Sequence, residues 1–350
     1  MVQNLKRVIR GMQVGGSLTG EGAEGCVFDK PLSCSTGIAP TTIGGKSVLT
    51  KLTTEDTEIF IGKQIMALPL ASNYFALPTQ SCRPRIPIDD PDIDKCELLQ
   101  DLEDEEGYMS FSLVSLFMPN GGESIDRWSR NPTLVANNYI RIFKHLLEGM
   151  ILYQKAGFIH NDIHGGNIVV DTEGVARYID FGMVYKIDNV TTMDSAGIHN
   201  RFKPTKVWHA PEIQVWRMLN SNKGLSVKEI IIDGLNKFIQ AGNNEYNIIQ
   251  KLPGSEDAVT ALTRFGEATQ NERKADNFGA IVRKYGKKMD MWRLGLVMLH
   301  LWRSLVTRKM LGFTHSIFAK ESAILHVLQG VTNFDGNKRW DPETALKHFV

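Results

Sequence analysis

Four side chains that could act on a phosphate group lie far apart in the 350-residue chain: Lys51, Asp162, Asn167 and Asp180. An ammonium group neutralises phosphate oxygens, and a carboxylate can take the proton from an attacking hydroxyl. Carboxylate and carboxamide oxygens are also the ligands that Mg²⁺ prefers. Any one of these residues alone is more often a strand edge or a turn. Their order and spacing, with Asn167 five residues after Asp162 and Asp180 thirteen further on, predict a site for phosphoryl transfer.

A glycine-rich segment precedes Lys51 and contains Gly20, Gly22 and Gly25. Glycine has no Cβ, so the backbone at such positions can approach phosphate oxygens and donate N–H bonds to them. The Gly-x-Gly-x-x-Gly spacing also opens dinucleotide-binding folds, and it can be a plain turn. A dinucleotide-binding fold requires a helix directly after the glycines. Here Val27 and Phe28 continue as a strand, which argues against a dinucleotide-binding fold and leaves a phosphate-binding turn and a plain glycine turn as the alternatives.

The elements around Lys51 follow from residue patterns. Residues 12–52 contain short β-type runs separated by glycines. Residues 53–68 have helical periodicity, and this helix offers a carboxylate that could hold Lys51 against phosphates. Glu58 is favoured as that partner, and Glu55 remains open. Ten carboxylates between residues 89 and 106 predict a solvated loop.

The other two functional segments lie in the second half of the chain. A strand is expected at Ser110–Met118 and a helix at Asn138–Lys155. The loop from His160 to Asn167 then separates this helix from the strand Ile168–Val170. We therefore expect an α+β chain, with a small β-rich front, a larger helical back and a ligand cleft between these two lobes.

Composition excludes several classes of protein. Forty basic and thirty-nine acidic residues give a net charge of +1, so bulk charge does not predict binding to nucleic acid or membrane. No apolar run approaches the ~20 residues of a membrane span, and the first residues do not form a secretion signal. Four unevenly spaced cysteines without a C-x-x-C pair argue against both a disulfide framework and a zinc site. We expect a soluble, intracellular, cytoplasmic protein.

Further motifs in the same order resemble the eukaryotic-type protein kinase superfamily, from about Gly20 to Phe349. Ala210-Pro211-Glu212 is similar to the element that closes the activation segment, and Arg339 resembles the arginine that pairs with its glutamate. Asp290-x-Trp292-x-Leu294-Gly295 resembles the helix start that anchors the catalytic loop. Met118–Glu123 is similar to the hinge, and His348-Phe349 to the closing pattern.

The resemblance implies a bilobal kinase domain over residues 12–348. Its N-lobe would cover about 12–118 and its C-lobe about 119–348. ATP and Mg²⁺ would be the cofactors. Lys51, held by Glu58, would contact the α- and β-phosphates, and Asn167 and Asp180 would hold the metal. Asp162 would deprotonate the acceptor hydroxyl. The remaining nucleotide contacts would come from Gly20, Gly22, Gly25, Val27, Met118 and Glu123, the last at the ribose.

Two departures from the family pattern lie in the catalytic loop. Asn161 replaces the arginine that usually pairs with a phosphorylated activation loop, so alanine at Thr191, Thr192 or Ser195 should leave most activity intact. His164 replaces the lysine of Ser/Thr kinases and resembles instead the aminoglycoside and choline kinases. A histidine can still donate to the γ-phosphate, although its charge titrates near neutrality; the alternative is a packed loop histidine.

Other departures concern the adenine pocket and an insertion. Leu49 stands where the family has an alanine over the adenine, and its larger side chain narrows that side of the nucleotide pocket. Ser115 stands at the gatekeeper position and opens the rear of the pocket, so the sequence does not establish selectivity for adenine. Seventy-seven residues separate Glu212 from Asp290, where the family has about a dozen. This insertion, about residues 216–286, has predominantly basic charges and predicted helices at 229–239 and 245–252. It either docks a partner or only packs on the large lobe. Large inserts and an altered catalytic loop also resemble kinases of large DNA viruses, which would place the protein in a host cell or virion.

The resemblance favours an ATP-dependent kinase that phosphorylates Ser or Thr of protein substrates, since the catalytic loop lacks the tyrosine-kinase pattern. One alternative is a small-molecule phosphotransferase, which would generally lack the glycine loop, Ala210-Pro211-Glu212 and the Asp290 helix. A second is a pseudokinase scaffold, which commonly lacks at least one of the four chemical residues. No nucleic-acid or membrane partner is indicated.

Overall fold

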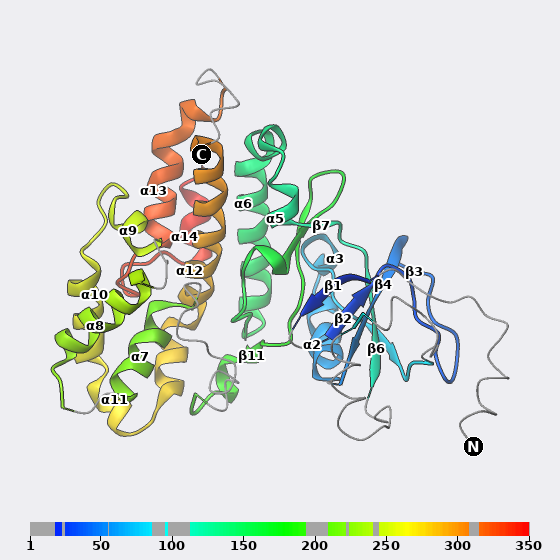
Figure 1. The fold of residues 1–350 in the computed structure, drawn as a ribbon, viewed down its shortest axis with the longest axis horizontal. Coiled ribbons are helices and arrows are strands. Elements are labelled where there is room, and N and C mark those ends of the chain that lie inside the picture. The colour runs from blue at the N-terminus through cyan, green and yellow to red at the C-terminus, as the bar shows by residue number, and fades with distance from the viewer. Residues whose placement is uncertain are drawn as a thin grey trace. The chain divides into compact units, whose positions relative to one another are not determined.

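The computed structural model describes residues 18–22, 25–54, 56–85, 95–96, 113–193, 209–221, 224–240, 245–307 and 315–349. The chain forms two compact units, coloured mainly blue to cyan and green to red in Figure 1. The small unit comprises the chain up to Gly121 together with Asp180–Gly182, and the large unit comprises Gly122–Ile179 and Met183 onward. Glu55, Ser195 and the carboxylates at 89–106 lie outside the described residues.

An antiparallel sheet forms the small unit, with the strand order β1-β2-β4-β6-β5 and β3 paired to β4. These strands are β1 (Leu18–Gly22), β2 (Gly25–Phe28), β3 (Thr42–Ile43), β4 (Lys46–Thr53), β5 (Gln80–Cys82) and β6 (Val114–Pro119). Two helices, α2 (Thr57–Met66) and α3 (Ala71–Tyr74), follow β4. The helix expected from residue 53 begins at Thr57, because Thr53 still pairs with Val114 in the sheet.

Two disulfides cross-link the small unit, so the expectation of no disulfide framework was wrong. Cys26 is bonded to Cys96 and Cys34 to Cys82, with Cα–Cα distances of 5.9 and 5.8 Å. The partners are 70 and 48 residues apart, so the spacing of the cysteines along the sequence does not indicate which of them pair. Tertiary pairing brings them together: Cys34 forms a β-bridge with Pro84, two residues beyond Cys82.

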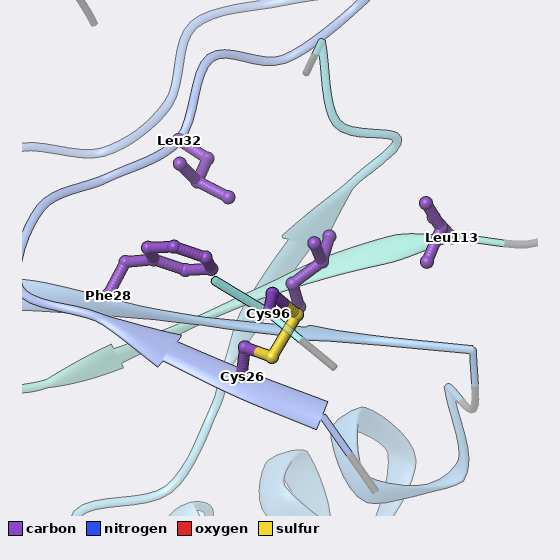
Figure 2. Packing of buried hydrophobic residues seen from close by; sticks show 6 residues of the cluster. Cys26, Phe28, Leu32, Cys96 and Leu113 are labelled. Carbon is purple, nitrogen blue, oxygen red and sulfur yellow. A yellow bond between two sulfur atoms is a disulfide. The ribbon is translucent and has the colours of Figure 1, made fainter. Parts of the chain in front are cut away.

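The first disulfide lies in the apolar core of the small unit (Figure 2). Cys26, Cys96 and Phe28 pack there with Leu32, Leu52 and Leu113, and all six are at most 5% exposed. Burial of these side chains and the covalent link therefore stabilise the same region of the sheet that carries Lys51.

The large unit is mainly helical. Its longest helices are α6 (Pro132–Lys155) and α12 (Phe278–Thr307). Asn131 caps α6 by accepting from the backbone N–H groups of Thr133 and Leu134, and Pro132 suits the first helical turn because it lacks an N–H. The remaining helices are α5 (Ile125–Trp128), η1 (Gly165–Asn167), η2 (Ile187–Asn189), α7 (Pro211–Ser221), α8 (Val227–Gln240), α9 (Glu245–Gln250), α10 (Ala258–Ala268), α11 (Gln270–Lys274), η4 (Phe318–Lys320), α13 (Glu321–Val331) and α14 (Pro342–Lys347).

Short strands position the loops of the large unit. Strands β7 (Glu123–Ser124), β9 (Ile168–Val170) and β10 (Ala176–Tyr178) form one sheet in the order β10-β9-β7. Strand β8 (Phe158–Ile159) pairs with β11 (Tyr185–Lys186). In the described part of the chain, no helix combines the length and apolar character needed to cross a bilayer.

The insertion forms α8 to α11, and the helices predicted at 229–239 and 245–252 correspond to α8 and α9. Tyr246 on α9 is buried, donates to Gln214 Oε1 at 2.6 Å, and stacks on Phe334 with ring centroids 5.1 Å apart. The insertion is thus packed into the core of the large unit.

Candidate active site

Lys51 of the small unit is held by two carboxylates. Its Nζ lies 2.7 Å from Glu58 Oε2 and 3.1 Å from Asp180 Oδ1. Lys51 is near the end of β4 and Glu58 is in the first turn of α2, so the strand-to-helix connection brings them together. Both side chains are buried. Glu58 is therefore the carboxylate that pairs with Lys51; Glu55 lies outside the described residues.

The two carboxylates decide the charge of Lys51. Burial alone would lower the pKa of its ammonium group, but the negative charges and hydrogen bonds of Glu58 and Asp180 raise that pKa well above the ordinary value. The group is consequently a fixed positive charge, which is what a phosphate-binding lysine requires.

Asp180 lies in a short left-handed segment. Its φ is 56°, an uncommon conformation for a residue with a side chain. Its Oδ1 accepts from the backbone N–H of Gly182 at 3.3 Å. The next residue, Phe181, is buried and meets Phe75 edge to face at 5.8 Å. Packing of Phe181 thereby fixes the backbone that aims Asp180 at Lys51.

Gly20, Gly22 and Gly25 lie in β1 and β2, while the tip of the turn, residues 23–24, lies outside the described residues. Gly25 has a φ of 151°, and a Cβ there would collide with the carbonyl oxygen of Leu52. A side chain at this position is therefore excluded by the backbone of β4. On β2, Val27 pairs directly with Lys51.

The residues expected around adenine lie on adjacent strands and at the hinge. Leu49 on β4 pairs with Met118 on β6, and Ser115 on β6 pairs with Leu52. Met118 and Ser115 are buried. Glu123 belongs to the large unit, where it is exposed and pairs with Val170.

In the large unit, the carboxylate of Asp290 anchors the catalytic loop, His160–Asn167. Its Oδ2 accepts from His160 N–H at 2.8 Å and from the hydroxyl of Tyr153 at 2.9 Å. Its Oδ1 accepts from Asn161 N–H at 3.0 Å. Asp290 lies inside α12, not at a helix start as the sequence motif had indicated, because α12 begins at Phe278.

Asp162 and Asn167 contact each other within this loop. Asn167 Nδ2 donates to the carbonyl oxygen of Asp162 at 2.9 Å and to its Oδ2 at 3.1 Å. The carboxamide nitrogen is thus used within the protein, and the carbonyl oxygen of Asn167 is the atom suited to a metal.

His164 is also turned toward Asp162. Its Nδ1 accepts from Gly166 N–H at 3.0 Å, and its Nε2 lies 3.7 Å from Asp162 Oδ2. Burial alone would raise the pKa of Asp162, but polar contact with His164 and the positive charges of His164, His160 and Arg293 lower it to about 2. Asp162 is therefore a carboxylate at neutral pH.

The activation-segment motif is fixed by a buried ion pair. Glu212 accepts from Arg339, whose Nη1 lies 3.0 Å from Oε1 and 3.1 Å from Oε2, and both residues are at most 1% exposed. This confirms the pairing predicted for Arg339.

The structure thus brings the predicted residues together in two groups. Lys51, Glu58 and Asp180 meet in the small unit, and Asp162, His164 and Asn167 meet in the large unit. The convergence of both groups on one nucleotide stays a prediction. Arg293, a buried residue of α12 beside Asp290, was not among the residues predicted for the site. A charged residue within an apolar helix, three positions after an aspartate, was the available signal.

Comparison with known proteins finds similarity to protein kinases over part of the chain. Residues 99–226 match the protein kinase domain family. The chain is 33% identical over 106 residues to mitogen-activated protein kinase kinase kinase 3 of Arabidopsis thaliana, covering 30% of this chain and 15% of that protein. It is 28% identical over 138 residues to MAP kinase kinase kinase mkh1 of Schizosaccharomyces pombe, covering 39% and 12%. It is 33% identical over 82 residues to mitogen-activated protein kinase kinase kinase A of Dictyostelium discoideum, covering 22% and 8%.

The chain therefore spans 15% or less of the length of these relatives. The matched segment carries the catalytic loop, Asp180 and Glu212, while the glycine turn and Lys51 precede it. A sheet-based small unit and a helical large unit, with these residues in these positions, form a bilobal α+β protein kinase fold. The match of residues 99–226 to the protein kinase domain family and the similarity to these kinases support assignment to the eukaryotic-type protein kinase superfamily.

Proposed function

We propose that the protein is an ATP-dependent serine/threonine protein kinase. The observation that carries this proposal is the buried lysine with two carboxylates, Lys51 with Glu58 and Asp180. A buried ammonium group is costly unless it is paired, and the two carboxylates hold Lys51 in place at 2.7 and 3.1 Å. The relatives include mitogen-activated protein kinase kinase kinases, which supports a protein as the phosphate acceptor.

In this mechanism, Asp162 orients the acceptor hydroxyl and takes its proton. The hydroxyl oxygen forms a bond to the γ-phosphorus as the bond between that phosphorus and the β–γ bridging oxygen breaks, which leaves ADP. The transition state is loose, so positioning and charge neutralisation supply most of the acceleration. Lys51 would provide one positive charge, and His164 would donate to the transferred group.

Mg²⁺ fits the donor set, because Asn167 offers a carboxamide oxygen and Asp180 a carboxylate, both hard oxygen ligands. When bound, it would neutralise charge on the phosphate oxygens. Asn167 is prepared for this role by its bond to Asp162, which fixes the amide plane. The contacts of Gly20, Gly22, Gly25, Val27, Met118 and Glu123 with the nucleotide belong to the same proposal.

The activation-segment pair of Glu212 with Arg339 favours a protein acceptor over a small alcohol, since small-molecule kinases generally lack this element. His164 is the feature in favour of a small-molecule acceptor. A scaffold role is disfavoured, because Lys51, Asp162, Asn167 and Asp180 are all present.

The test is Mg-ATP turnover with a mixed protein substrate and, separately, with small alcohols. We expect phosphoserine and phosphothreonine in protein, and a loss of at least about 100-fold in Asp162→Asn and Lys51→Met. Matched controls are Asp233→Asn and Lys63→Met, which change exposed residues on α8 and α2. Phosphate transfer to small alcohols alone would show that the protein is a small-molecule phosphotransferase. Nucleotide binding without turnover would show that it is a pseudokinase scaffold.

Two further expectations stay predictions. Docking of a partner on residues 216–286 is one, and a cytoplasmic location, in a host cell or virion for a viral protein, is the other. Disulfides are typical of oxidising compartments, so the two in the small unit weigh against a reducing cytoplasm.

A further inference from the structure

Asn161, which replaces the usual arginine of the catalytic loop, has a specific partner in the large unit. Its side-chain Oδ1 accepts from Nη2 of Arg293 at 2.7 Å, and both residues are buried. The backbone of Asn161 has a φ of 63°. Asparagine is one of the few residues with a side chain that tolerates this left-handed conformation. Asn161 therefore fits the loop by both its backbone and its side chain.

Arg293 reaches the loop from α12. Its guanidinium is fully buried and lies 3.2 Å from Asp290 Oδ1, the oxygen that also accepts from Asn161 N–H. One Asp–Arg pair on a single helix thus binds both the backbone and the side chain of Asn161. Taking both charges out of water is costly, and burial at this position makes the pair a rigid support for the loop.

We propose that Arg293 is a positioning residue that holds the catalytic loop through Asn161. Asp162 follows Asn161 directly, so fixing the side chain and N–H of Asn161 restrains the backbone that carries the catalytic carboxylate. The positive charge comes from within α12, a permanent part of the fold. The loop is therefore ordered without a phosphate group on the activation segment. This inference rests on the proposed kinase function for its effect on turnover, but not for its effect on loop order.

The test compares Arg293→Met, Asn161→Gly and the double variant with wild type. Glycine removes the carboxamide of Asn161 while tolerating the positive φ. Amide hydrogen exchange of residues 160–167 is measured on the dephosphorylated protein, together with kcat and KM for ATP. Leu301→Ala is the matched control, because Leu301 is a buried residue about two turns further along the same helix.

We expect each single variant to exchange faster across the catalytic loop and to lose about 10- to 100-fold in kcat, with a smaller change in KM. The double variant should resemble Arg293→Met, because both changes break the same contact. Leu301→Ala should lower stability without faster loop exchange. Dephosphorylated wild type should retain its full kcat.

Loop exchange in Arg293→Met equal to that in Leu301→Ala would overturn the inference, as would additive effects in the double variant. An absence of turnover in wild type would count against the proposed function alone, since the exchange rates still decide the role of Arg293. A need for activation-segment phosphorylation in wild type would also contradict the inference.

Discussion

At the scale of single residues, each charge in the candidate site is held by a nearby group of complementary charge or polarity. Lys51 is buried between two carboxylates, and Asp162 lies beside an imidazole. Because burial opposes ionisation of both groups, their charged states depend on these neighbours. The pKa values of Lys51 and Asp162 therefore depend on their neighbours, and removing a neighbour should change them.

The clearest case is Asp162, whose pKa is lowered to about 2, although burial alone would raise it. Since the folded-state value lies below the unfolded one, ionised Asp162 stabilises the fold above about pH 4. That contribution is lost as the pH falls toward 2. In His164→Ala the main opposing interaction disappears, and the pKa of Asp162 should rise by at least about one unit. Carboxylate ¹³C chemical shifts, assigned with Asp162→Asn, measure this change.

The control is His300→Ala, which removes an exposed imidazole that contacts Glu245 instead. It should leave the Asp162 titration unchanged. An Asp162 pKa that stays near 2 in His164→Ala would show that His164 does not set it.

At the scale of elements, the insertion behaves as part of the large unit. Tyr246 of α9 stacks on Phe334 and lies near Trp292 of α12, with ring centroids 6.0 Å apart for the second pair. Arg264 of α10 forms an ion pair with Asp335, which lies outside the insertion, at 2.7 Å. These contacts favour the packing interpretation of the insertion. They also mean that deleting residues 220–280 would uncover core residues, so point substitutions are the better probe.

Tyr246→Ala should lower the free energy of unfolding by about 3–5 kcal/mol, the range for deleting a large buried aromatic side chain. The loss includes the hydrogen bond to Gln214. Ile239→Ala on the exposed side of α8 is the comparison, and it should change stability by less than about 0.5 kcal/mol. Urea unfolding followed by tryptophan fluorescence measures both. Equal, small effects would mean that the insertion contributes nothing to the core and is free for another role.

At the scale of the whole molecule, the features that were predicted from the sequence are those that depend on local residue patterns. The pairing of Lys51 with Glu58 follows from a strand end and the next helix turn, and the two-unit α+β plan follows from the change of periodicity. Contacts set by tertiary packing were missed where no family motif pointed to them, unlike the pair of Glu212 with Arg339. The disulfide partners are 48 and 70 residues apart, and Arg293 meets a loop 132 positions earlier. The start of α12 was also predicted wrongly. The helix was expected to begin near Asp290, but it begins at Phe278, which belongs to the insertion.

The disulfides lead to a prediction about the molecule as a whole. All four cysteines lie in the small unit, and the tryptophans that the structure describes lie in the large unit: Trp128, Trp216, Trp292, Trp302 and Trp340. In the chain-entropy view, closing loops of 48 and 70 residues stabilises the folded state by about 4 kcal/mol for each bridge. Reductant should therefore speed amide exchange in β4 strongly while leaving the urea unfolding curve of the tryptophans nearly unchanged.

A variant with all four cysteines changed to serine should resemble the reduced protein and show no response to reductant. Four titratable thiols in the native, unreduced protein would contradict both bridges, and equal β4 exchange before and after reduction would show that the bridges do not stabilise the sheet.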